Sequence, residues 1–194
     1  AGEALGADDY VSIAYRNRQR YLPEITPKPL LPVTGSRQTL SIDTGATYLV
    51  TAGTSAVGLE LCKHLAQHKV RLVITDTPVL PVKDSWEEVL DNVHHPFYHI
   101  IKSLVSFERD GAEVQYYATD LAKENDLANV LAIIAEQYGA ITGIFHLEAF
   151  TGNKDPLSLL QGTDNLLELA ANQNGWMIGF TSYHTIIGAE GKAS

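Results

Sequence analysis

Residues 47–76 read TYLVTAGTSAVGLELCKHLAQHKVRLVITD, and this stretch contains one complete supersecondary unit. A short apolar strand over 48–51 leads into a glycine-containing turn over 52–58. Apolar residues then recur at helical spacing from Leu59 to Leu65, and residues 70–75 form a second apolar strand. The stretch therefore predicts a parallel βαβ unit, for which about thirty residues is the usual length.

The same alternation continues along the rest of the chain. The sequence predicts helices over 86–93, 97–109, 124–138 and 156–174, and strands over 113–117, 141–146 and 176–181. Strands separated by helices of this length form a parallel sheet with helices on both faces. We therefore predict a doubly wound α/β fold of the Rossmann type.

The residues before this unit differ from it in their sequence pattern. Residues 10–15 alternate apolar and polar, and the basic cluster 16–20 precedes Tyr21 and Leu22, which predicts two short strands joined by a turn. Four prolines interrupt the segment 23–45, which is typical of a connector. We expect residues 1–45 to form a β arm and connector, and residues 46–194 to form the Rossmann-type domain.

Composition narrows the class of partner. The 194 residues are 45% hydrophobic and 19% charged, as in a soluble globular domain. The net charge of −9 argues against binding to nucleic acids or anionic membranes, which requires a positive surface. No apolar stretch is long enough for a membrane span, and we expect a cytoplasmic protein. Cys62 is the single cysteine, and its apolar helical setting predicts a buried, inert thiol.

The turn after the first strand is a candidate phosphate-binding site. In such a sheet, ligands bind beyond the carboxyl ends of the strands, and this turn directs backbone N–H groups at a pyrophosphate. Glycine permits positive φ and close approach of the backbone, which Gly53 and Gly58 supply, with Thr54 and Ser55 between them. The alternative is that both glycines serve only a tight turn.

Asp76 ends the second strand about twenty residues after the turn. An acidic side chain there accepts hydrogen bonds from the ribose 2′-OH, and its charge would favour NAD over NADP. The alternative is that Asp76 only caps a loop.

Beyond this pattern, the chain from about residue 11 to its end resembles the ketoreductase domain of a modular polyketide synthase, a member of the short-chain dehydrogenase/reductase superfamily. The similar segments, in order, are 14–21, 48–58, 72–81 with Trp86 following, 111–114, 118–120, 143–146 and 180–191. The resemblance implies NADPH-dependent reduction of a carrier-bound β-ketoacyl thioester, with the neighbouring synthase domains and an acyl carrier protein as partners. It also implies that 14–21 corresponds to the strand pair joining the family's structural and catalytic subdomains.

Departures from the family's cofactor motifs imply weak or no cofactor binding. The family's turn is T-G-x-x-x-G-x-G, and Ala52 and Ala56 stand where its first two glycines belong. Thr77 stands where the family places an Arg for the NADP 2′-phosphate, beside the unfavourable Asp76. Residues 146–149 read H-L-E-A where the family has H-A-A-G, and the loss of the glycine together with the arrival of Glu148 would crowd the nicotinamide side and add charge.

The catalytic set of the family is also incomplete. Its Tyr protonates the carbonyl oxygen, its Lys lowers the Tyr pKa, and its Ser binds the same oxygen. Ser182 aligns with the Ser, whereas Leu159 stands at the Lys position, counted back from Gly162. The Tyr position would directly follow Ser194, so the resemblance implies a fold incomplete at its C-terminus, through truncation or natural loss.

The remaining polar features have two interpretations each. Asp120 matches the family's adenine contact or caps the following turn. His146 is a half-buried structural histidine or an acid–base group, the first being favoured. The basic cluster 16–20 is a solvated turn or docks an acidic carrier domain.

Histidines 94, 95 and 99 could supply two metal ligands on one helical face, but Pro96 interrupts that helix and a third ligand is not evident. Tyr183 and His184 are adjacent to Ser182 and diverge from it in direction, which argues against a role as replacement catalytic residues. We therefore predict no metal site and no substitute for the family's Tyr and Lys.

Three hypotheses follow. The first is a non-reducing ketoreductase-like domain with a structural role in polyketide biosynthesis and no bound cofactor. The second is an active reductase in which further residues supply the Tyr and a displaced Lys. The third, motivated by Asp76, is a non-catalytic domain that binds and senses NAD.

Overall fold

The computed structural model describes residues 14–21, 40–147, 156–170 and 175–180, in two compact units. The first unit includes the strand pair near the N-terminus, and the second spans Ser41–Phe180. No helix among these residues has the length and apolar character needed to cross a membrane.

The first unit contains a hairpin of β1 (Ala14–Arg16) and β2 (Gln19–Tyr21). Asn17 and Arg18 have φ of 53° and 62°, the left-handed conformations that a tight two-residue hairpin turn requires. The two strands predicted from the sequence are therefore present, but the basic cluster is divided between the turn and the strand ends. Tyr15 lies opposite Arg20, and all described side chains of the hairpin are exposed.

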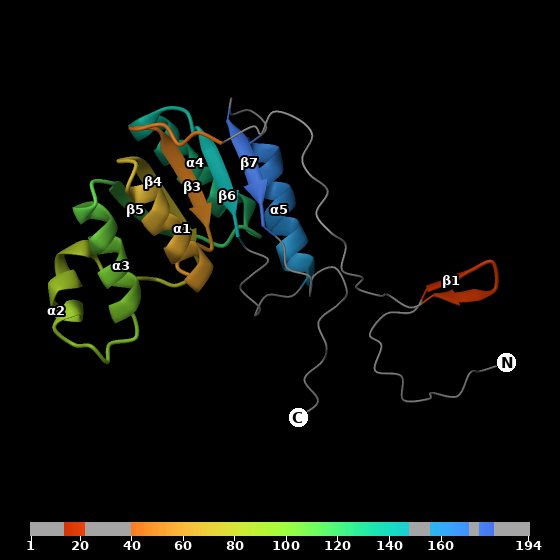
Figure 1. Cartoon of the computed structure of the whole chain (residues 1–194), viewed down its shortest axis with the longest axis horizontal. Coiled ribbons are helices and arrows are strands. Elements are labelled where there is room, and N and C mark those ends of the chain that lie inside the picture. The colour runs from red at the N-terminus through yellow and green to blue at the C-terminus, as the bar shows by residue number, and fades with distance from the viewer. Residues whose placement is uncertain (1–13, 22–39, 148–155, 171–174, 181–194) are drawn as a thin grey trace, which may run out of the picture. The chain divides into compact units, whose positions relative to one another are not determined.

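The second unit contains a five-stranded parallel sheet in the order β5-β4-β3-β6-β7 (Figure 1). Its strands are β3 (Thr47–Thr51), β4 (Arg71–Asp76), β5 (Glu113–Ala118), β6 (Gly143–His146) and β7 (Trp176–Gly179). The chain builds outward from β3 through β4 to β5, then returns to place β6 on the other side of β3. This reversal confirms the predicted doubly wound fold and creates a switch point between β3 and β6, where such sheets bind ligands.

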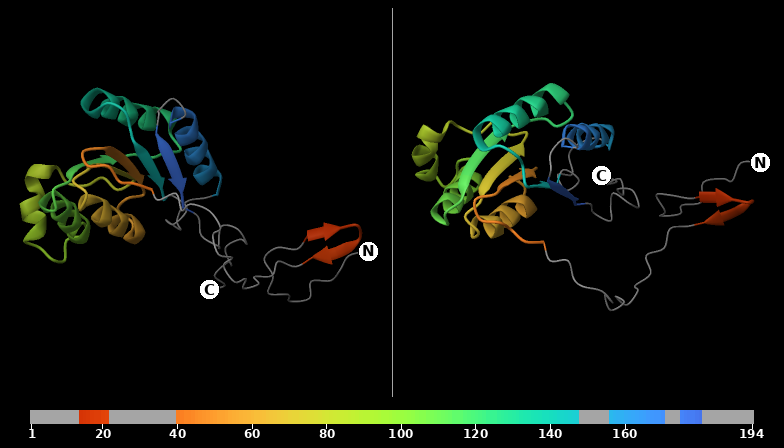
Figure 2. Two further views of the ribbon diagram at one scale, coloured as in Figure 1. Left: turned by 45° about the horizontal axis from the view of Figure 1, so that its top comes forward. Right: turned by 90° about the horizontal axis from the view of Figure 1, so that it is seen from above.

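Helices cover both faces of the sheet, as Figure 2 shows. They are α1 (Ala56–Ala66), the 3₁₀ turn η1 (Lys83–Ser85), α2 (Trp86–Leu90), α3 (Tyr98–Arg109), α4 (Glu124–Tyr138) and α5 (Pro156–Ala170). Strand β3 shows how the layers form, because alternate side chains enter different cores. Tyr48 and Val50 pack with α1 and α3, while Leu49 packs with α4 and α5. All three side chains are fully buried, which makes β3 the centre of the unit.

The main difference from the predicted elements is at α2. The helix predicted over 86–93 ends at Leu90, because the polar residues that follow form turns. The Asn92 side chain accepts a hydrogen bond from the amide of His94, and the amide of Asn92 donates to the Val89 carbonyl. Short polar side chains of this kind compete with the helical hydrogen bonds.

Candidate functional site at the carboxyl edge of the sheet

The turn between β3 and α1 is built on close backbone contacts at two glycines. A Cβ added to Gly53 would lie 2.5 Å from Ile74 Cγ2, and one added to Gly58 would lie 2.6 Å from Gly53 Cα. Neither glycine has positive φ, contrary to the expectation from the sequence; Ala52 has it instead, at 49°. Gly53 is therefore required because Ile74 of β4 packs against it, and Gly58 because the start of α1 packs against the turn. The strained backbone lies instead at Ala52, a residue with a Cβ.

Most amide groups of this turn donate to acceptors within the protein. Gly53 N donates to the Thr75 carbonyl at 3.3 Å, and Ser55 N donates to the Ala52 carbonyl at 3.1 Å. Ser55 is the N-cap of α1, and its Oγ accepts a hydrogen bond from Gly58 N at 3.1 Å. The cofactor-binding candidates Gly53, Ser55 and Gly58 thus have structural partners.

The amides of Ala56 and Val57 are the exception in the first turn of α1. Neither donates to an acceptor within the residues that the structure describes. The side chain of Val57 is 43% exposed, so this helix end is open to solvent. Two free amides at a helix N-terminus are suited to a phosphate group.

The carboxylate of Asp76 is held by Thr54 and Thr77. Its Oδ2 accepts hydrogen bonds from Thr54 Oγ1 at 2.5 Å and from Thr54 N at 3.2 Å. Its Oδ1 accepts from Thr77 N at 2.8 Å. Asp76 is buried, and its carboxylate therefore links the end of β4 to the turn after β3.

The edge strand β5 supports this part of the site. Thr119 N donates to the Asp76 carbonyl at 2.7 Å, and Tyr116 Oη donates to the Pro78 carbonyl. Burial raises the pKa of Tyr116, and the negative charge of Asp76 raises it further, so Tyr116 stays protonated as a donor.

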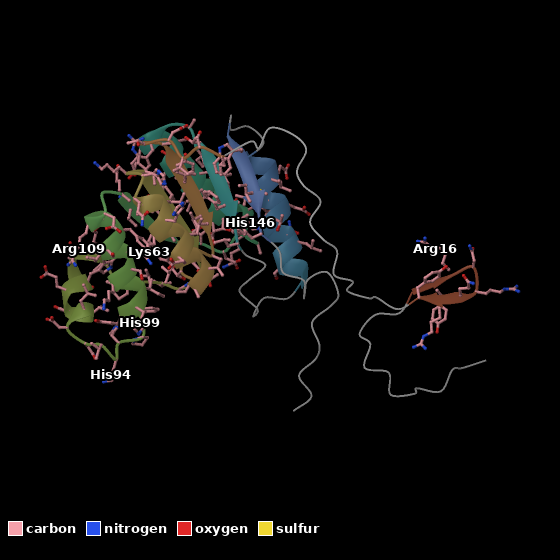
Figure 3. All side chains as sticks on the ribbon, viewed as in Figure 1. Arg16, Lys63, His94, His99, Arg109 and His146 are labelled. Carbon is pink, nitrogen blue, oxygen red and sulfur yellow. The ribbon has the colours of Figure 1, made fainter. Side chains whose placement is uncertain are left out.

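A chain of hydroxyl and imidazole groups crosses the switch point. His146 Nδ1 lies 2.8 Å from Thr51 Oγ1, and His146 Nε2 lies 3.0 Å from Thr163 Oγ1 on α5. Thr51 Oγ1 also accepts a hydrogen bond from Leu147 N at 3.1 Å. These contacts connect β3, β6 and α5. Figure 3 shows His146 on β6, whereas His94 and His99 lie on the α2–α3 side.

Helix α5 is held against the loop that follows β5. Asn165 Nδ2 donates to the Leu121 carbonyl at 2.9 Å, and a Cβ added to Gly162 would lie 3.1 Å from Leu121 Cβ. Asp120, in the same loop, accepts a hydrogen bond at Oδ1 from Ala122 N at 3.2 Å, the geometry of a turn cap. Its predicted adenine contact stays a prediction.

Leu159 belongs to α5, three residues before Gly162 and four before Thr163. The assignment of position 159 to the family's Lys stays a prediction. Ser182 and Glu148, together with the chain end at Ser194, lie outside the described residues.

No group of three or more His, Cys, Asp or Glu residues that could hold a metal ion occurs in the described parts of the chain. His95 lies in a turn before α3, where its Nδ1 accepts a hydrogen bond from Phe97 N. His95 and His99 therefore do not lie on successive turns of one helix.

Thr51, Thr163 and Asn165 were not among the site residues predicted from the sequence. All three are ordinary polar residues, and Thr51 and Asn165 are distinguished by being buried. A buried polar residue requires a partner, so a polar residue inside a predicted apolar pattern was the available signal.

The site fits a dinucleotide in part. The free amides of Ala56 and Val57 suit a pyrophosphate, as in Rossmann-type folds. The adenosine side does not suit a 2′-phosphate, because Asp76 is acidic and the residues that follow it, Thr77 and Pro78, carry no positive charge.

Comparisons with known proteins agree with this architecture. The family model described as KR domain matches residues 46–194. Polyketide synthase PksL of Bacillus subtilis is 28% identical over 156 residues, which is 79% of this chain and 3% of that protein. The 6-methylsalicylic acid synthase of Aspergillus terreus is 26% identical over 154 residues, which is 78% of this chain and 8% of that protein. The chain thus spans a small part of these relatives.

Two solved structures share the fold. A ketoreductase domain from the bacillaene assembly line has a TM-score of 0.59 and 21% identity, covering 92% of this chain and 41% of that one. An N-terminal ketoreductase from the macrolactin assembly line has a TM-score of 0.58 and 19% identity, covering 87% and 32%. With the family model matching most of the chain, the protein belongs to the KR domain family, the ketoreductase domains of polyketide synthases within the short-chain dehydrogenase/reductase superfamily.

Proposed function

We propose that this domain does not reduce ketones and that it has a structural role within a polyketide synthase. The observation that carries the proposal is Leu159, which stands at the position where the resemblance places the catalytic Lys. Leu provides neither the positive charge that lowers the pKa of a tyrosine nor a hydrogen-bond donor for a ribose. This loss is internal to α5 and is independent of where the chain ends.

The packing of α5 supports this assignment of position 159. Asn165 and Gly162 hold the helix to the Leu121 loop, and Thr163 holds it to His146 at the end of β6. Helix α5, to which position 159 belongs, therefore contacts the carboxyl edge of the sheet, where a catalytic Lys would be needed. A lysine from another part of the chain would have to reach the same edge to replace it.

The cofactor side supports the same proposal. Reduction in this family depends on a nicotinamide dinucleotide, which supplies the hydride when bound. Ala52 has a strained, positive φ in the turn, and the Asp76 carboxylate repels the negative charge of a 2′-phosphate. Asp76 therefore disfavours NADPH in particular.

The partners that we propose are the neighbouring synthase domains and an acyl carrier protein, in the cytoplasm. The two synthases compared above are long chains of which this domain matches a small part, so a role in spacing or orienting neighbours is consistent with its retained fold. Retention of both buried cores is expected when selection acts on shape.

The test measures binding and turnover together in the intact protein. We expect no oxidation of NADPH or NADH in the presence of a β-ketoacyl thioester of N-acetylcysteamine, with a reducing ketoreductase domain as positive control. Micromolar binding of NADPH by calorimetry, together with turnover of the thioester, would reject the proposal. The same result would support the alternative of an active reductase with a displaced Lys and a Tyr from further residues.

A second candidate function is the binding of NAD without catalysis. It is favoured by Asp76, which suits an unphosphorylated ribose, and by the free amides of Ala56 and Val57. This function predicts a larger increase in the melting temperature with NADH than with NADPH. No increase with either nucleotide would exclude it.

A further inference from the structure

We propose that Asp76 and Thr54 form an internal lock that keeps dinucleotides out of the turn between β3 and α1. The inference rests on the proposed function, because it explains how a retained nucleotide-binding fold is kept from binding the cofactor. In the locked state, the Asp76 carboxylate accepts the hydrogen bonds that the hydroxyl and the amide of Thr54 donate. The ribose of a nucleotide must then displace an existing contact before it gains one with the Asp76 carboxylate.

The geometry of the carboxylate is the first argument. A carboxylate has about four acceptor positions, and Asp76 uses three of them on Thr54 Oγ1, Thr54 N and Thr77 N. The two hydroxyls of a ribose would need two positions. Asp76 therefore binds a ribose diol fully only after releasing at least one bond from Thr54 or Thr77.

The burial of the pair is the second argument. Asp76 is only 8% exposed, and hydrogen bonds from donors to a buried carboxylate are stronger than those between neutral groups. The 2.5 Å contact between Thr54 Oγ1 and Asp76 Oδ2 is the shorter of the two that Thr54 makes. The hydroxyl of Thr54 is therefore the main closing contact.

The backbone of Asp76 is fixed from the opposite side, which is the third argument. Its carbonyl accepts a hydrogen bond from Thr119 N at 2.7 Å and lies 3.4 Å from Tyr116 Oη. The end of β4 is thus tied to β5 as well as to the turn. With its backbone held, the side chain has little freedom to turn toward a ligand while keeping its contact with Thr54.

The test is Thr54→Val, which keeps the shape of the side chain and removes its hydroxyl. We expect Thr54→Val to raise the affinity for NADH by about tenfold or more, the usual effect of one hydrogen bond to a charged group. Isothermal titration calorimetry with NADH on the intact protein measures the change. Asp76→Asn, which removes the charge, is expected to raise the affinities for NADH and NADPH together.

Thr44→Val is the matched control. Thr44 is exposed in the turn before β3, at the amino end of the strand, so removal of its hydroxyl leaves the lock intact and the affinity unchanged. A folded Thr54→Val protein with unchanged or lower NADH affinity overturns the lock, as does an equal gain in Thr44→Val. Turnover by the wild-type protein would instead reject the proposed function, so the two failures are distinguishable.

Discussion

Thr51 and Thr75 are neighbours in the parallel register of β3 and β4, and their hydroxyl groups have opposite environments. Both side chains are buried. Thr51 Oγ1 contacts His146 Nδ1 and accepts a hydrogen bond from Leu147 N. Thr75 Oγ1 has no hydrogen-bond partner among the described residues. The hydroxyl of Thr51 therefore connects β3 to the end of β6. The hydroxyl of Thr75 is a buried polar group with no hydrogen bond among the described residues to offset the cost of its burial.

For these two residues, we expect the same Thr→Val substitution to change the free energy of unfolding in opposite directions. Thr75→Val replaces an unpaired buried hydroxyl with a methyl group of similar size, and we expect it to raise the free energy of unfolding by about 1 kcal/mol. Thr51→Val leaves His146 and the Leu147 amide without their partner, and we expect a loss of about 1–3 kcal/mol. Urea denaturation followed by circular dichroism measures both.

The two variants control for each other, since they introduce the same methyl group at adjacent buried positions. A loss of stability in Thr75→Val as large as that in Thr51→Val would show that Thr75 Oγ1 has a partner, such as a buried water.

The contact between Gly53 and Gly58 gives a second prediction. A methyl group at position 58 would lie within 2.7 Å of the Ala52 carbonyl oxygen and of backbone atoms of Gly53, none of which can move without shifting the turn. We expect Gly58→Ala to destabilise the protein by about 2–4 kcal/mol, in the range of severe overpacking. The midpoint of thermal unfolding should fall accordingly.

Gly179→Ala is the control for this substitution. Gly179 is exposed in β7, and a Cβ there would meet no atom of the described residues within 4 Å. Its stability should change by less than about 0.5 kcal/mol. Equal effects at the two positions would mean that α1 is not packed as closely on the turn as the structure indicates.

The layers of the fold were predictable because they depend on local patterns. Helix α4 has the predicted bounds of 124–138, and β3 and β4 differ from prediction by single residues. Apolar periodicity is a local property, and so is the alternation of strand and helix that implies a parallel sheet. The hairpin turn was less predictable, because Arg18 adopts positive φ without being Gly, Asn or Asp.

The contacts of the candidate site were not predictable in the same way. The pairing of Asp76 with Thr54 spans 22 residues, and the pairing of Thr51 with His146 spans 95. Both depend on which strands become neighbours and on the side-chain rotamers there. Sequence spacing predicts that Asp76 lies at the end of its strand. It does not predict which donors form hydrogen bonds with its carboxylate.

The positive φ of Ala52 gives a third prediction. The left-handed conformation costs about 1–2 kcal/mol for a residue with a Cβ, and glycine avoids most of this cost. We therefore expect Ala52→Gly to raise the free energy of unfolding by up to about 1 kcal/mol, although the methyl group of Ala52 is buried. Ala56→Gly, at the exposed first position of α1, should lower it by up to about 1 kcal/mol. Urea denaturation of both variants measures these changes in the free energy of unfolding. A loss of stability in both would show that the positive φ of Ala52 causes little strain.

The buried thiol of Cys62 predicts how stability depends on pH. Burial raises the pKa of Cys62, so the folded protein holds this proton to higher pH than the unfolded chain does, which releases it near pH 8.5. A folded-state pKa above the unfolded one gives stability that is complete below the unfolded pKa and is lost as the pH rises beyond it. Between pH 8.5 and 9.5, below the range in which tyrosines ionise, the free energy of unfolding should fall by about 1 kcal/mol.

Cys62→Ala removes the ionising group, so its free energy of unfolding, although lower at every pH, should lack this decline. Urea titrations of both proteins at the two pH values test the difference. Parallel declines in wild type and variant would place the effect on another group, and rapid alkylation of native Cys62 by iodoacetamide would show that the thiol is accessible, because the thiolate is the reacting form.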